Sequence, residues 1–145
     1  MRFELLDEIV ERSADRLVAR KHVGDADDYL RDHFPAFPIL PGVMMLETLV
    51  QAGRRLAADL RGVPHDADLP AMAVAEVRKV TYAAMVRPGQ TLVADVKLRK
   101  ADADAGVFDF EGVGTVNEIE AVKGRFRLRD VDPAERLGRP IAATH

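Results

Sequence analysis

Hydrophobic and polar positions follow a helical period in one stretch of the chain and a strand period in most of the rest. Between Val43 and Arg61 apolar residues recur every three or four positions, as one buried helix face requires. Gly62 and Pro64, just beyond this stretch, are typical of a helix end. The first turn, Val43 to Leu46, is apolar nearly all round, which predicts burial on every side. The pattern therefore predicts one long helix of about 28 Å.

Alternation of apolar and polar residues predicts antiparallel strands that bury one face. It is clearest at 92–99, 108–111 and 122–129, and weaker at 71–83. Before the helix, 3–11 and 17–23 indicate two short strands joined by a polar turn at 12–15, and a further turn is predicted at 87–90. Beyond residue 131 the pattern is lost, so we expect 132–145 to form a flexible tail. Two strands, one buried helix and four strands predict an α+β fold in a single domain of residues 1–131. Its antiparallel sheet wraps around one long central helix.

Composition excludes several kinds of chemistry. The 145 residues include no Cys and a single Ser, Ser13, which stands in a charged stretch. A disulfide, a thiolate metal site and a cysteine nucleophile are therefore excluded, and a Ser-His-Asp hydrolase is not expected. The net charge is −3, with both signs mixed along the chain, which is unlike a nucleic-acid binder. With neither a signal-peptide pattern nor an apolar run long enough to span a bilayer, we expect a cytoplasmic protein without nucleic-acid or membrane partners.

The segment from His33 to Glu47 carries the candidate chemistry. Three prolines, at 35, 38 and 41, hold its first half extended, so the helix can begin only after Pro41. An imidazole can act as a base near neutral pH, and burial favours the protonated, acidic form of a carboxyl. At Gly42 the free N–H groups of a helix N-terminus can bind a developing oxyanion. Base, acid and oxyanion donors suit proton abstraction alpha to a carbonyl, followed by loss of a beta hydroxyl.

Residues 32–52 read Asp-His-Phe-Pro-Ala-Phe-Pro-Ile-Leu-Pro-Gly-Val-Met-Met-Leu-Glu-Thr-Leu-Val-Gln-Ala. This segment resembles the signature of FabZ-type 3-hydroxyacyl-[acyl-carrier-protein] dehydratases, His-Phe-Pro-Gly-x-Pro-x-x-Pro-Gly-Val followed by Glu-Ala-x-x-Gln. The fourteen-residue step from His33 to Glu47 fits that pattern. Weaker likeness extends to 3–7 and 86–92. The related FabA-type dehydratase-isomerases have Asp in place of Glu, so Glu47 favours the FabZ side.

The resemblance implies a hot-dog fold that forms a homodimer, with a hexamer of three dimers left open. The active site would lie at the dimer interface, with His33 of one subunit facing Glu47 of the other. His33 would remove the C2 proton, and Glu47 would assist departure of the C3 hydroxyl as water. The product would be a trans-2-enoyl thioester, which makes the chain a lyase of fatty acid biosynthesis. The implied partner is an acyl thioester on acyl carrier protein, and no cofactor is expected.

The same resemblance assigns substrate-binding residues. The Gly42 amide would hydrogen-bond the thioester carbonyl, Gln51 would orient Glu47, and Val43 would lie at the substrate. Phe37 departs from the family pattern and would narrow or reshape the acyl tunnel.

A second departure lies at 82–86, Tyr-Ala-Ala-Met-Val, where the family has Phe, two basic residues, Pro and Val. Those basic residues border the site where an acidic carrier protein docks, and the candidate replacements are Arg54, Arg55, Arg78, Lys79 and Arg87. Two alternatives therefore stay open. One is a hot-dog acyl thioesterase that uses a carboxylate and water, and the other is a non-catalytic module that binds acyl thioesters or the carrier protein.

Taken alone, Glu47 would be interpreted as a helix-surface carboxylate paired with Arg54 or Arg55. Spacings of seven and eight residues fit poorly with the usual pairing four residues apart, where Gln51 stands. We therefore do not expect an arginine partner. The histidines other than His33 lack ligand spacing with another His or a carboxylate, so no metal site is expected.

Overall fold

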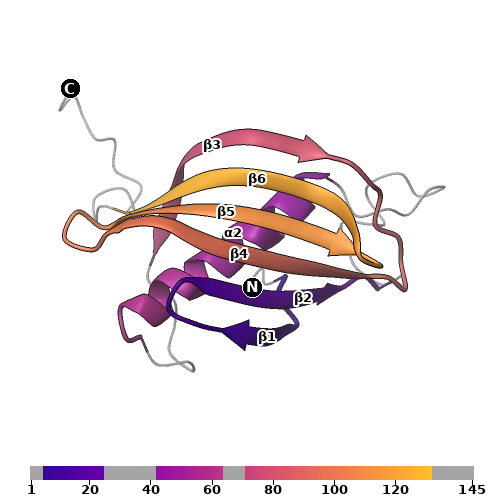
Figure 1. Ribbon diagram of the computed structural model, residues 1–145, viewed down its shortest axis with the longest axis horizontal. Helices are drawn as coiled ribbons and strands as arrows, with labels where there is room; N and C mark the ends of the chain where they lie inside the picture. The colour runs from indigo at the N-terminus through magenta and orange to yellow at the C-terminus, as the bar shows by residue number, and fades with distance from the viewer. Residues whose placement is uncertain (1–4, 25–41, 64–70, 132–145) are drawn as a thin grey trace.

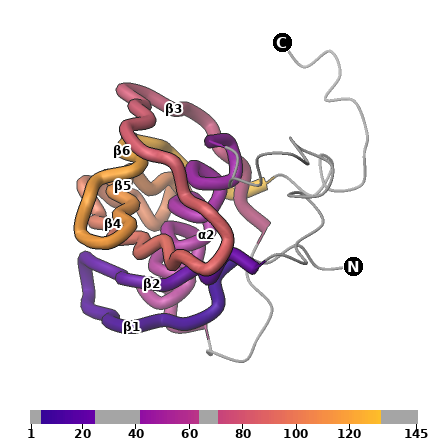
Figure 2. Tube along the Cα trace, turned by 90° about the vertical axis from the view of Figure 1, so that its right-hand side faces the viewer, coloured from indigo at the N-terminus to yellow at the C-terminus, as the bar shows by residue number. Residues whose placement is uncertain are grey.

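The computed structural model describes residues 5–24, 42–63 and 71–131. Within them the elements are β1 (Glu8–Arg12), β2 (Arg16–His22), α2 (Gly42–Leu60), β3 (Met72–Tyr82), β4 (Thr91–Asp102), β5 (Val107–Val116) and β6 (Ile119–Asp130). The strands form one antiparallel sheet in the order β1-β2-β4-β5-β6-β3, and α2 runs obliquely across one face of it (Figure 1). Seen from the side, the sheet curves around the helix (Figure 2). This arrangement confirms the predicted α+β hot-dog fold.

Observed element boundaries lie within three residues of the predicted ones, except in β1 and in β5, which continues to Val116 beyond the predicted end at residue 111. The strand predicted from residue 3 begins only at Glu8, and residues 5–7 lie outside it. Leu5 is 1% exposed, and its backbone N–H donates to Oε1 of Gln51 on α2 at 2.7 Å. This backbone group is therefore bonded to the helix and not to a neighbouring strand. The predicted tail, 132–145, lies outside the described residues.

The core lies between α2 and the concave face of the sheet. In β5 every second residue from Phe108 to Val116 is buried, which is the period that one covered face requires. The Phe110 ring stacks on the Phe126 ring of β6 with centroids 5.3 Å apart, and on Phe108 at 6.5 Å. The strand alternation therefore reflects contact with a single central helix.

The apolar sequence of the first turn of α2 predicts burial on every side, and this prediction is wrong. Met45 is 4% exposed, but Val43 is 67% exposed and Leu46 is half-buried. The reason is geometric, because the sheet covers one side of the helix and the apolar residues of this turn point in several directions.

In the described part of the chain, no helix has the length and apolar character that a bilayer span requires.

Gly53 allows α2 to approach β6 closely, and we predict that Gly53→Ala destabilises the protein. An ideal Cβ at this position would lie 2.7 Å from Cε2 of Phe126, a ring that is 3% exposed and held against Phe110. In a helix interior Gly→Ala ordinarily stabilises by about 0.5–1 kcal/mol. Here the overpacked core should lower the unfolding free energy by about 1–3 kcal/mol, measured by urea denaturation. In a Phe126→Leu background the loss should shrink, and an equal loss in both backgrounds would contradict the contact.

Candidate active site

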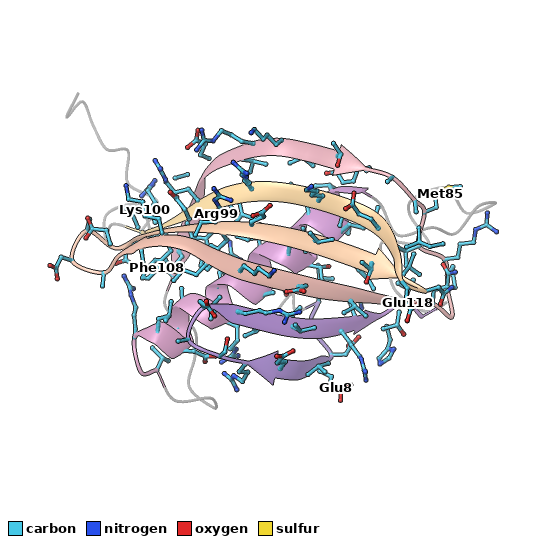
Figure 3. All side chains as sticks on the ribbon, viewed as in Figure 1. Glu8, Met85, Arg99, Lys100, Phe108 and Glu118 are labelled. Atoms are coloured by element: carbon cyan, nitrogen blue, oxygen red, sulfur yellow. The ribbon has the colours of Figure 1, made fainter. Side chains whose placement is uncertain are left out.

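The candidate site begins at the N-terminus of α2, beside the end of β3. An ideal Cβ at Gly42 would lie 3.1 Å from Cε1 of Tyr82, the last residue of β3. The backbone of Gly42 therefore lies against the edge of the Tyr82 ring, which leaves little room for a side chain at position 42. Tyr82 is 50% exposed, and Met85, 57% exposed, lies beyond the same end of β3 (Figure 3). An exposed aromatic side chain thus borders the start of the helix.

Glu47 lies on α2 in a half-buried position, with its side chain 31% exposed. Its Oε1 atom is 3.4 Å from Nε2 of Gln51 and 3.3 Å from Nη1 of Arg54. No residue within 5–24, 42–63 or 71–131 forms a hydrogen bond with Oε2. The two carboxyl oxygens therefore differ, since one is held by two donors and the other is open.

Gln51 connects Glu47 to the N-terminal segment of the chain. It lies one turn beyond Glu47, is 8% exposed, and accepts the Leu5 N–H through Oε1. Because a backbone N–H can only donate, this bond assigns the amide oxygen to Leu5 and turns Nε2 toward Glu47. The predicted spacing does bring the two side chains together, and an orienting role for Gln51 stays a prediction.

The expectation that Glu47 has no arginine partner is wrong. Seven residues amount to almost two helical turns, so Arg54 lies on the same side of α2 as Glu47, and its long side chain reaches back to the carboxyl. The rule of pairing at three or four residues misses this contact because it describes side chains that meet across one turn. The Arg54 side chain is 28% exposed, and its Nε is buried and has no hydrogen-bond partner in the described part of the chain.

Two predicted site residues, His33 and Phe37, lie outside the described residues, so the distance from His33 to Glu47 stays a prediction. Val43 points away from the core and is 67% exposed. The structure places Gly42, Glu47 and Gln51 along the first half of α2, and it brings Glu47 and Gln51 into contact. Arg54 is the residue that sequence reasoning rejected as a partner of Glu47.

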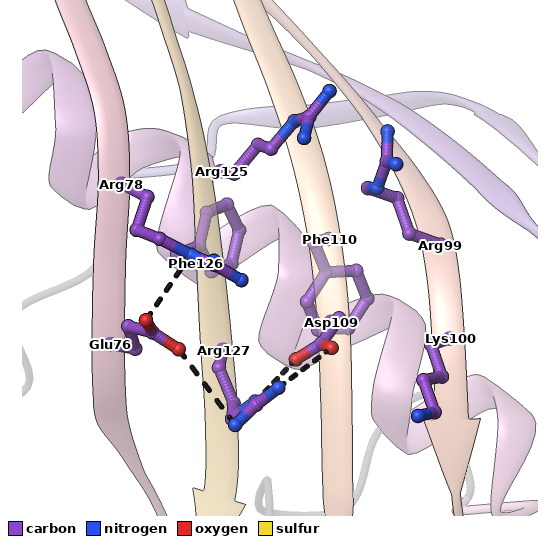
Figure 4. Close-up of a pocket in the computed structure, with 9 residues that line it drawn as sticks. All are labelled: Glu76, Arg78, Arg99, Lys100, Asp109, Phe110, Arg125, Phe126 and Arg127. Carbon is purple, nitrogen blue, oxygen red and sulfur yellow. Dashed lines mark hydrogen bonds and ion pairs between the residues drawn. The ribbon is translucent and has the colours of Figure 1, made fainter.

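The outer face of the sheet carries a hollow of about 300 Å³. Its lining is mostly charged: Glu76, Arg78, Arg99, Lys100, Asp109, Phe110, Arg125, Phe126 and Arg127. Arg127 donates to both oxygens of Asp109, at 2.6 and 3.1 Å, and lies 3.7 Å from Glu76 (Figure 4). The hydrogen bond from Arg127 holds the pKa of Asp109 below its ordinary value. The carboxylates here are thus paired with neighbouring arginines, as on the charged strand face that the alternation predicts.

Comparison with known proteins decides the family. Residues 1–125 match the model of the FabA-like domain. The chain belongs to the FabA-like family. Among curated members, it is 36% identical over 127 residues to the 3-hydroxyacyl-[acyl-carrier-protein] dehydratase FabZ of Thermotoga neapolitana, covering 87% of this chain and 85% of that protein. With the FabZ of Enterococcus faecalis it shares 37% identity over 116 residues, or 79% and 78% of the two chains. These relatives confirm the resemblance of the chain to FabZ-type dehydratases.

Solved structures confirm the hot-dog fold of this FabA-like chain. The dehydratase heterocomplex ApeI:P from Xenorhabdus doucetiae matches with a TM-score of 0.73 at 20% identity, covering 93% of this chain and 88% of that one. The F36A mutant of the fluoroacetyl-CoA-specific thioesterase FlK matches with a TM-score of 0.65 at 14% identity, covering 89% and 94%. Because dehydratases and thioesterases both share this fold, the fold alone does not choose between the two reactions.

We predict that Gln51→Leu lowers the unfolding free energy of this FabZ-like chain by about 1–3 kcal/mol, because it leaves the buried Leu5 N–H without an acceptor. Denaturant unfolding measures the change. Thr48→Val is the matched control, since the Thr48 hydroxyl donates to the Met44 carbonyl one turn earlier in the same helix, at 2.8 Å. Its effect should stay below about 1 kcal/mol. Equal losses in the two variants would show that the link to Leu5 contributes nothing.

Proposed function

We propose that this chain is a 3-hydroxyacyl-thioester dehydratase that forms a trans-2-enoyl thioester and water. The observation that carries the proposal is identity of 36% to a curated FabZ over 87% of the chain. The proposed substrate is the acyl thioester of an acyl carrier protein, as the names of those relatives state. Retention of the segment from His33 to Glu47 supports the same reaction.

In the proposed mechanism the Gly42 N–H donates a hydrogen bond to the thioester carbonyl at the start of α2. His33 removes the C2 proton, and the electron pair of that C–H bond forms the C2=C3 double bond. The C3–O bond breaks, and its oxygen takes a proton from Glu47 and leaves as water. Glu47 is left as a carboxylate and His33 as an imidazolium, so returning the proton from His33 to Glu47 completes the cycle.

The edge of β3 supports a homodimer. β3 is the last strand of the sheet, its second edge has no partner among the described strands, and it exposes apolar side chains at Val74, Val77 and Tyr82. An open edge with unpaired backbone groups favours pairing with another strand. We propose that two β3 edges pair, so that His33 of one subunit faces Glu47 of the other. A hexamer built from three such dimers stays an open alternative.

The catalytic roles predict that His33→Ala and Glu47→Gln each lower turnover at least about 100-fold while the protein stays folded. The assay follows enoyl formation and free-thiol release from a 3-hydroxyacyl carrier protein, with circular dichroism as the check on folding. Glu8→Gln, which changes a carboxylate exposed on β1, is the matched control and should keep full activity.

Three outcomes would contradict the proposal. Full activity of both variants would refute the assigned residues. Release of free thiol without enoyl product would instead identify an acyl thioesterase. Stoichiometric binding of the acylated carrier without any product would identify a non-catalytic binding module.

A shared site predicts complementation between the two inactive variants. When His33→Ala and Glu47→Gln subunits are unfolded and refolded together, about half of the dimers contain one subunit of each kind. Each mixed dimer has one site with both native residues, so activity should return to about a quarter of the native value. Light scattering establishes that the species is a dimer. A mixture as inactive as its components would place the two residues in the same subunit.

A further inference from the structure

Among the described residues, hydrogen-bond donors contact one carboxyl oxygen of Glu47 and leave the other open. Two N–H donors, from Gln51 and Arg54, reach the same carboxyl oxygen, Oε1, at 3.4 and 3.3 Å. Within the described chain, Oε2 has no hydrogen-bond partner. An acid that delivers a proton to a leaving hydroxyl needs one oxygen free for that task.

Neither Gln51 nor Arg54 can accept a hydrogen bond from a protonated Glu47 in this arrangement. A guanidinium has no acceptor, and the Gln51 amide oxygen is already bound to the Leu5 N–H at 2.7 Å. A protonated Oε1 would therefore meet two groups that only donate. When Glu47 carries a proton, that proton therefore lies on Oε2, the open oxygen.

The position of the Arg54 side chain is tied to its contact with Glu47. Its Nη1 donates to Glu47, while its Nε is buried and has no hydrogen-bond partner among residues 5–24, 42–63 and 71–131. A buried N–H without an acceptor is unfavourable, so the position is not explained by packing alone. The Arg54 guanidinium lies beside the negative charge that Glu47 carries once its proton has left.

We propose that Arg54 is a positioning residue for Glu47. Together with Gln51 it holds Oε1, so that Oε2 faces the substrate and delivers the proton to the C3 hydroxyl. The inference rests on the proposed function, since it assigns the atom through which Glu47 acts. Arg54 acts through Glu47 and does not itself touch the reacting atoms.

Kinetics of three variants test this role. Arg54→Met removes the donor but keeps a long side chain, and should lower kcat about 10- to 100-fold with KM for the 3-hydroxyacyl thioester nearly unchanged. Arg54→Lys keeps the charge and should recover part of the loss. Arg99→Met is the matched control, because it removes the same charge from the outer sheet face, where Arg99 pairs with Glu111. It should leave both constants unchanged.

Two kinetic outcomes would overturn the proposal. An unchanged kcat in Arg54→Met would show that Gln51 alone holds Glu47. A raised KM with kcat retained would show that Arg54 binds the substrate or its carrier instead.

A second readout does not require turnover. The infrared difference spectrum of the native protein minus Glu47→Gln isolates the Glu47 carboxyl band, and Arg54→Met should shift this band while Arg99→Met should not. An unshifted band would overturn the contact. If the native protein forms no enoyl thioester, the proposed function fails and the catalytic role of Arg54 fails with it. In that case the band still decides whether Arg54 holds Glu47, so the two failures are distinguishable.

Discussion

The structure depends on the burial of α2 against the concave face of the sheet. The buried positions of β4, β5 and β6 alternate because a single helix covers that face and solvent covers the other. Contact between helix and sheet is close where side chains are absent, as at Gly53 beside the Phe126 ring and at Gly112 beneath Leu49. A bulkier residue at either position, one on α2 and the other on β5, would push the helix away from the strands and change the orientation of the side chains it carries.

The same helix carries the polar residues of the candidate site at the edge of the core. Gln51 and Arg54 follow Glu47 by one turn and almost two turns, so the three side chains form a row along α2. The row lies where the covered side of the helix meets its open side, which is why Gln51 is buried while Glu47 and Arg54 remain partly exposed. Leu5 holds Gln51, the middle residue of this row, through a backbone hydrogen bond, which links the N-terminal segment to the geometry of the site.

The fold is shared by proteins of different activity. The structural neighbours include a dehydratase complex at a TM-score of 0.73 and a thioesterase mutant at 0.65, so a curved sheet around a helix serves both classes. On a shared fold, the activity depends on the side chains of the site. In this chain a carboxyl with one held and one open oxygen suits the delivery of a proton to a leaving group. This property belongs to a few side chains and would be lost by changes that leave the fold intact.

The sequence by itself determined the elements, their order and the family, because each depends on local signals. Periods of two and of three to four residues predict strands and helix, and the signature from His33 to Glu47 lies within one short segment. Only the tertiary structure decided the exposure of Val43, the bond from Leu5 to Gln51, and the pairing of Glu47 with Arg54. Exposure depends on which side of the helix the sheet covers, and the Leu5 contact joins residues forty-six positions apart. Arg54 and Glu47 lie in the same helix. Their pairing nevertheless depends on the direction of the long, flexible Arg54 side chain, which the packing around it decides.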